Sequence, residues 1–258
     1  MCVFFSKINT IACAGPWVVL CALLGGAAIG RADVMATLKV DEPGIGAVYR
    51  VVRWPSLSDF IADRDRVNIG TRVVSSQTPL FSVSPQGDLI AAEVAPWDPT
   101  QIEVYQYRDA LDFCRDNNLI LGVVANPMNW MGLTFDHVGK VYAIQESQNS
   151  GGGWIYNARR WPDMGSFLTQ APSTDLGARI STTRQLGVEF VDGRLITLSE
   201  TTEAGGPVYQ VWDWGTSFSG FIQNAGALVG THRGGQEIVG LFSGTHAPDV
   251  VETSVVRR

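Results

Sequence analysis

Charged residues are scarce in this sequence. Asp, Glu, Lys and Arg make up 17% of its 258 residues, whereas 45% are hydrophobic. Such a composition excludes an intrinsically disordered chain, a coiled coil and a helical bundle rich in Glu and Lys. Positive charge is not in excess either, because the formal net charge is −6. We therefore expect neither nucleic acid nor an anionic membrane surface as a partner.

Cysteine is almost absent outside the first segment of the chain. Of the four cysteines, Cys2, Cys13 and Cys21 lie within residues 1–32, and Cys114 is the fourth. If that segment is removed, an intramolecular disulfide is excluded and the fold depends on its core. Cys114 follows Phe113 and has no histidine close in sequence, which favours a buried structural thiol over a nucleophile.

Residues 1–32 have the pattern of a secretory signal. Lys7 supplies a positive charge, residues 11–29 carry none, and the small residues Gly30 and Ala32 precede a predicted cut before residue 33. An uncleaved membrane anchor is the alternative, because an uncharged stretch of 19 residues almost spans a bilayer. We favour cleavage, since two glycines weaken such a helix. The mature protein is then expected to be secreted or periplasmic and free of the membrane.

Patterns of catalytic and metal sites are also missing. The three histidines, His137, His232 and His246, have no partner at metal-ligand spacing, and there is no HExxH, cysteine pair or GxSxG. We therefore predict no metal, no cofactor and no catalytic residue. A Ser-His-Asp site assembled from distant segments is left as an alternative.

What the sequence does contain is a repeat of 53 or 54 residues. Five sets of residues keep this period with deviations of at most two residues, which chance does not produce. The sets are Trp54, Tyr107, Trp161 and Trp214; Phe60, Phe113, Phe167 and Phe221; Gly70, Gly122, Gly177 and Gly230; Phe81, Phe135, Phe190 and Phe242; and Glu93, Glu146, Glu200 and Glu252.

Within each repeat the pattern indicates β-strands. Short apolar runs such as 132–135 are followed by a turn with glycine and a second strand, and a third strand alternates as in 208–211. We expect a fourth strand around the repeat glycine and assign that glycine to a tight hairpin with positive φ. No long helical periodicity occurs, and residues 109–117 are the nearest to one.

Four strands repeated four times predict an all-β fold, a β-propeller of about four blades of four antiparallel strands over residues 33–258. Each small sheet needs neighbours on both faces, which a closed ring provides. Residues 37–42 have the pattern of a second strand and residues 240–242 that of a first strand. We therefore expect one blade to combine the N- and C-terminal strands. Residues 249–256 also resemble a second strand, and their place is left open.

The run from Gly132 to Ala143, Gly-Leu-Thr-Phe-Asp-His-Val-Gly-Lys-Val-Tyr-Ala, resembles the blade signature of NHL and SMP-30-type propellers and is similar to that of tachylectin-like propellers. This resemblance implies an architecture shared by proteins of unrelated activity. SMP-30-type enzymes hold a divalent metal through acids in the channel. Here the residues after the first-strand phenylalanines imply no such ring of ligands, because they are Ser82, Asp136, Val191 and Ser243.

Aromatic rings repeated once per blade could stack on sugar faces. For the column Trp54, Tyr107, Trp161 and Trp214 we favour packing between blades, because large aromatic side chains are mostly buried. The predicted binding residues are the tryptophans outside this column, which lie in loops or beside strand ends: Trp97, Trp130, Trp154 and Trp212.

For two sets of polar residues that recur with the repeat, we predict structural roles. The repeat glutamates are expected to accept hydrogen bonds from the turns that follow their strands. Arg72, Arg179 and His232 each follow a repeat glycine by two residues. We expect them on a solvated edge, with an anion-binding face as the alternative.

These patterns favour a secreted, non-enzymatic binding protein that recognises extracellular carbohydrate. One alternative is a secreted enzyme of the lactonase or lyase type with its site at the channel mouth. Another is a protein-interaction scaffold, so the expected partner is an extracellular glycan or protein.

Overall fold

The computed structural model describes residues 33–42, 46–74, 80–125 and 129–244. All of them belong to one compact unit that begins at Ala32. The predicted signal segment, the strand expected at 249–256, His246 and Glu252 lie outside the described residues. No helix in the described part is long and apolar enough to span a membrane.

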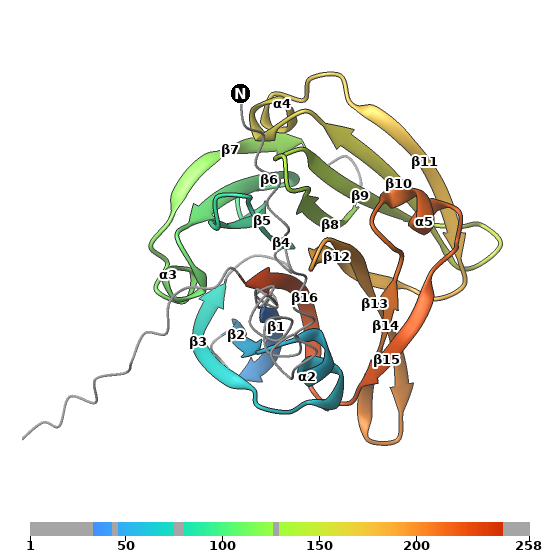
Figure 1. The fold of residues 1–258 in the computed structure, drawn as a ribbon. Coiled ribbons are helices and arrows are strands. Elements are labelled where there is room, and N and C mark those ends of the chain that lie inside the picture. The colour runs from blue at the N-terminus through green and yellow to red at the C-terminus, as the bar shows by residue number, and fades with distance from the viewer. Residues whose placement is uncertain (1–32, 43–45, 75–79, 126–128, 245–258) are drawn as a thin grey trace, which may run out of the picture. The chain divides into compact units, whose positions relative to one another are not determined.

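The described strands form four sheets of four antiparallel strands each, arranged around a common centre (Figure 1). Blade 1 contains, from the centre outwards, β16 (Glu237–Gly244), β1 (Asp33–Glu42), β2 (Gly46–Trp54) and β3 (Val67–Val74). Blade 2 contains β4 (Leu80–Val83), β5 (Leu89–Ala95), β6 (Asp98–Tyr107) and β7 (Leu119–Ala125). Blade 3 contains β8 (Asn129–Phe135), β9 (Val141–Gln148), β10 (Trp154–Trp161) and β11 (Thr174–Ser181). Blade 4 contains β12 (Gln185–Val191), β13 (Arg194–Glu203), β14 (Gly206–Asp213) and β15 (Ala227–His232). The predicted four-bladed β-propeller is confirmed.

The ring is closed within blade 1 by strands from the two ends of the described chain. β16 pairs antiparallel with β1, so that Lys39 lies opposite Glu237 and Met35 opposite Phe242. The predicted closure by N- and C-terminal strands is thereby confirmed, with β1 in the second position of the blade.

The apolar core lies between the blades. Each of the four clusters of buried hydrophobic side chains combines residues from two adjacent blades. No single blade covers its own apolar faces, which is why the repeat requires a ring.

In the described part, a short helix joins the third and fourth strands of each blade. The helices are α2 (Leu57–Ala62), α3 (Ala110–Cys114), α4 (Met164–Leu168) and α5 (Phe218–Ile222). Ser56, Asp109 and Asp163 cap the first three through hydrogen bonds to a backbone N–H three residues later. Only the region of α3 was suspected from the sequence, because one helical turn and a half is too short for a periodic pattern.

We expected the repeat glycines to form hairpin turns, and this expectation is wrong. They lie inside the fourth strands. Only Gly177 among them has a positive φ, of 110°. A Cβ on Gly70 would stand 2.9 Å from Cys114 Sγ in the next blade, and one on Gly230 would stand 2.5 Å from Ile61 Cγ2. Glycine recurs here because the helix of the following blade docks on this strand.

The first-strand phenylalanines are not all equivalent, which corrects the alignment of that column. Phe135 pairs with the same second-strand residue that pairs with Trp161. In blade 2, by contrast, Phe81 pairs with Ala91, whereas Tyr107 pairs with Leu89, two residues earlier. The residues after these phenylalanines are therefore not a structural set, and no conclusion about a metal ring follows from them.

Candidate functional site

The aromatic column Trp54, Tyr107, Trp161 and Trp214 is buried at the ends of the third strands. Each ring meets the repeat phenylalanine of its own blade edge-on, with centroids 5.1–5.3 Å apart and planes 81–85° from parallel. These four ring pairs are therefore part of the core, and their faces are not exposed to a ligand.

The side chain two residues after each repeat glycine packs on the ring pair of the next blade. We call the four places junctions 1/2 (Arg72), 2/3 (Val124), 3/4 (Arg179) and 4/1 (His232). Arg179 is 7% exposed and His232 is 2% exposed. Our expectation of a solvated edge at these positions is wrong, because these side chains of the outer strand pack against the neighbouring blade.

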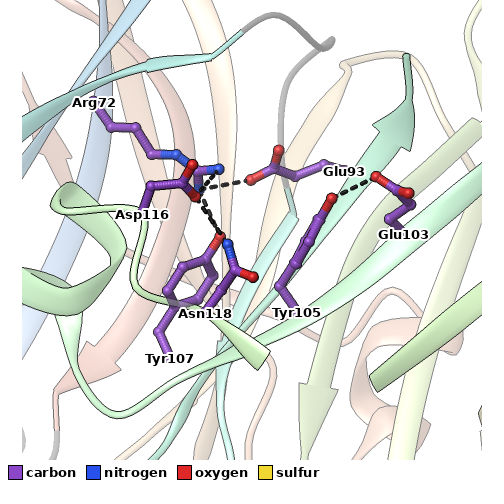
Figure 2. A network of polar contacts seen from close by, with 7 residues as sticks. All are labelled: Arg72, Glu93, Glu103, Tyr105, Tyr107, Asp116 and Asn118. Atoms are coloured by element: carbon purple, nitrogen blue, oxygen red, sulfur yellow. Dashed lines mark hydrogen bonds and ion pairs between the residues drawn. The ribbon is translucent and has the colours of Figure 1, made fainter. Parts of the chain in front are cut away.

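At junction 1/2, Arg72 is the centre of a polar network (Figure 2). Its Nη1 donates to Glu93 Oε1 at 3.0 Å and to Tyr107 Oη at 2.6 Å, and its Nη2 lies 2.8 Å from Asp116 Oδ1. The guanidinium lies 4.7 Å from the centre of the Phe113 ring. Burial lowers the pKa of Arg72, but the charges of Glu93, Tyr107 and Asp116 outweigh it, so the net shift is upward.

A second, separate set of polar contacts lies beside this network on β6 (Figure 2). Glu103 lies opposite Glu93 in the β5–β6 register. Its carboxylate accepts hydrogen bonds from the Tyr105 hydroxyl and, at 3.2 Å, from Trp97 Nε1. Trp97, in the turn between β5 and β6, is 60% exposed. An exposed indole is thus held in place beside a carboxylate, and we call Trp97, Glu103 and Tyr105 the Trp97 platform.

The other three predicted binding tryptophans are half-buried. Trp130 packs against Trp161 and Phe167. Trp212 stacks on Trp214 with centroids 5.7 Å apart and donates to Ser199 Oγ at 2.9 Å. These contacts place both side chains on the edge of the core, and their role in binding stays a prediction.

Trp154 opens β10, and the Arg184 guanidinium lies 5.0 Å from the centre of its ring. Arg184 also pairs with Glu146, whose side chain is buried. The two repeat glutamates for which the structure shows ion pairs have arginine partners that we had not expected. Glu93 and Glu146 bind arginines that come from a neighbouring blade or from the segment that leads into it.

Sequence reasoning missed a buried carboxylate at the centre of the ring. Glu189 on β12 accepts one hydroxyl hydrogen bond from each of the other blades: Ser82 Oγ at 2.9 Å, Thr134 Oγ1 at 3.0 Å and Ser243 Oγ at 2.8 Å. Burial raises the pKa of Glu189 to about 7. The signal was an acid inside the apolar run 187–190, which has the pattern of a first strand.

Beside this carboxylate the axis is almost filled by the first strands. The void between Leu80, Gly132, Gly187 and Gly240 measures about 10 Å³, the minimum for one water molecule. This void between the first strands is therefore too small for any ligand larger than a water molecule.

The remaining titratable candidates lie apart from one another. Nδ1 of His232 is 2.6 Å from the carbonyl oxygen of Phe60, and its ring stacks on the Phe60 ring. Cys114 is half-buried on α3, and burial raises the pKa of its thiol to about 11. Among residues 33–42, 46–74, 80–125 and 129–244, no three His, Cys, Asp or Glu side chains converge as metal ligands.

No protein-family model matches the chain, and no curated protein sequence matches it. The resemblance of residues 132–143 to NHL and SMP-30-type blades has no family match behind it and stays a prediction.

Proposed function

We propose that this propeller is a non-enzymatic binding protein and that its ligand, an extracellular carbohydrate, contacts the Trp97 platform. The observation that carries the proposal is the exposed Trp97 indole fixed by its hydrogen bond to Glu103. An indole face suits the apolar C–H face of a sugar ring, and a carboxylate beside it accepts sugar hydroxyls. Holding the ring in place beforehand reduces the entropy lost on binding.

The test is a glycan array followed by titration of the best soluble oligosaccharide, with affinity measured by calorimetry. Trp97→Ala is expected to weaken binding at least tenfold, which corresponds to about 1.4 kcal/mol, and Trp97→Tyr to retain most of it. Leu119→Ala is the matched control, because Leu119 is similarly exposed in the same blade. An array without any binding, or equal losses in Trp97→Ala and the control, would contradict the proposal.

A protein-interaction scaffold is the second candidate, and one observation favours it. β7 is an outer strand whose side chains Leu119, Ile120 and Val123 are exposed. Exposed apolar side chains on an edge strand are a feature of protein contact surfaces. If the array is negative, cross-linking that depends on these three residues would support this alternative.

The lactonase or lyase alternative requires a polar pocket at the mouth of the central channel. The void on the axis within the described residues measures about 10 Å³, so nothing there supports it over binding. Turnover of a lactone by the purified chain would establish it.

Export is part of the proposal. Residues 1–32 predict a cleaved secretory signal, and an extracellular glycan is accessible only to an exported protein. The check is the N-terminal sequence of the protein recovered outside the cytoplasm, which is expected to begin at Asp33. An intact N-terminus on a membrane-bound protein would favour the anchor instead.

A further inference from the structure

A cavity of about 150 Å³ lies on blade 1 and is independent of the Trp97 platform on blade 2. Its lining residues are Arg50 and Val52 of β2, Arg66, Asn68 of β3 and Gln236, which precedes β16. The volume corresponds to about five water molecules. Arg66 and Asn68 are exposed, so the cavity is accessible from solvent.

The lining is positively charged. It contains two guanidinium groups, two side-chain amides and one valine, and no carboxylate. This is unusual for a chain with a net charge of −6. Arginines that face the same cavity repel each other unless an anion lies between them.

Arg50 is the residue that most needs a partner. Its Nε is buried, and within the described residues it has no hydrogen-bond partner. A buried donor without an acceptor is unfavourable, because it has lost its hydration and gained nothing in return. An oxygen acceptor placed in the cavity would satisfy it.

Two acids that are close in sequence to the lining residues have cations as partners, and one of these cations is Arg66 itself. Asp63 Oδ2 lies 3.5 Å from Arg66 Nη1, at the outer end of that side chain. Glu237, next to Gln236, pairs with Lys39 at 3.5 Å. Neither ion pair includes Arg50, and among the described residues no ion pair to its guanidinium is found.

We propose that this cavity binds an oxyanion, either a free ion or the acidic group of a larger ligand. The planar guanidinium matches the oxygens of carboxylate and phosphate through paired N–H donors. Arg50 binds the anion from the inner wall and Arg66 from the entrance, while Asn68 and Gln236 donate amide hydrogen bonds.

The experiment titrates the full chain with sodium phosphate, sodium acetate and sodium galacturonate at constant ionic strength, with sodium chloride as the reference. Calorimetry and the melting temperature report binding. We expect saturable, millimolar binding of at least one oxyanion. Tighter binding of phosphate indicates a phosphate-type ion, and tighter binding of galacturonate than of acetate indicates an acidic sugar. If none of the three binds more than chloride, the proposal is wrong.

Two variants decide whether the binding is at this cavity. Arg50→Gln is expected to weaken it at least tenfold, and Arg159→Gln, which removes the same charge from an exposed position on blade 3, to change it less than twofold. Equal losses in both would show a general charge effect and overturn the proposal. If Arg50→Gln does not fold, Arg66→Gln replaces it, with an expected loss of at least threefold.

The arginine Nε resonance adds a readout that a purely structural role would not move. In protein with ¹⁵N-labelled arginine, the Nε signal of Arg50, assigned by its loss in Arg50→Gln or Arg50→Lys, should shift with the added anion along the calorimetric curve. An Arg50 signal that stays fixed while other arginines shift would place the anion elsewhere and refute the assignment.

Discussion

Junctions 1/2 and 3/4 use the same residue in opposite electrostatic surroundings. Arg72 and Arg179 both lie over the ring pair of the next blade, at 4.7 Å from Phe113 and 4.9 Å from Phe221. Arg72 has Glu93 and Asp116 as ionic partners. Arg179 has none among the described residues, and its Nε and Nη1 lack hydrogen-bond partners there.

The pKa values of the two arginines follow this difference. Burial lowers the pKa of Arg179, whereas that of Arg72 is raised because its acids outweigh burial. Val124 and His232 occupy the same position at junctions 2/3 and 4/1. The position therefore requires a side chain that fills the space over two rings, and among the described residues ion pairs are an addition found at junction 1/2.

The largest effect expected from this comparison is that of Arg72→Met. The substitution keeps the bulk but removes the cation that faces the buried carboxylate of Glu93, so we expect a loss of about 3–5 kcal/mol in the free energy of unfolding. Urea unfolding at pH 7 measures it. The double variant Arg72→Met/Glu93→Gln should recover at least half of the loss. A loss below about 1 kcal/mol would show that the ion pair at junction 1/2 matters no more than the bulk.

The carboxylates allow a second comparison, because Glu93 has a cation as partner, whereas Glu189 accepts hydrogen bonds from three hydroxyls and one backbone N–H. The pKa of Glu189 rises from 4.5 to about 7 on folding. The folded protein thus keeps a proton that the unfolded chain releases, and stability falls by about 3 kcal/mol as the pH rises from 4.5 to 7. Glu189→Gln should remove this dependence in urea unfolding at several pH values.

His232 acts in the opposite sense, because burial lowers its pKa and the folded state resists protonation. The difference between wild type and Glu189→Gln isolates the carboxylate, since His232 is present in both. If the two proteins lose stability in parallel between pH 4.5 and 7, the axial carboxylate is not the cause.

A third comparison concerns the space beside the repeat glycines at junctions 4/1 and 2/3. A Cβ on Gly230 would stand 2.5 Å from Ile61 Cγ2, whereas one on Gly122 would stand 3.3 Å from Leu168 Cδ2. We expect Gly230→Ala to cost about 1–3 kcal/mol by overpacking and Gly122→Ala less than about 1 kcal/mol. Thermal melts of the two variants measure the difference, and equal losses would show that helix docking is not the reason for the glycine.

The smallest effect is expected at junction 3/4. Arg179→Met gives up a cation–π contact of about 0.5–2 kcal/mol but also removes buried N–H groups without partners, which cost about as much. The free energy of unfolding should change by less than about 1 kcal/mol. A loss as large as that of Arg72→Met would reveal an ionic partner outside the described residues.

The sequence was sufficient for the architecture because one blade makes the same contacts in every copy. Trp54 and its three counterparts each contact a phenylalanine of the same blade. Because this contact is the same in every blade, the two rings recur in the sequence with a period of 53 or 54 residues. Ring closure could also be predicted, since an unpaired second strand near residue 37 and a first strand near residue 241 complement each other.

The sequence was insufficient where neighbouring blades decide a residue's surroundings. The repeat glycines are required by the close approach of a helix in the next blade. Arg72 and Arg179 are buried by ring pairs some 35 residues further along the chain. Glu189 depends on hydroxyls 54 to 107 residues away. A single blade seen alone does not contain this information. Exposure of Trp97, in contrast, followed from its place in a loop.

Closure by β16 also dictates when the protein can become stable during its synthesis. The strand nearest the axis of blade 1 is the last of the described strands along the chain, so a nascent chain that stops before residue 237 holds three blades and an uncovered partial sheet. Cooperative burial is then postponed until translation has passed this strand, and pairings this distant in sequence form slowly. A chain that folds late stays unfolded long enough to pass a translocation pore, which is compatible with the export that we propose.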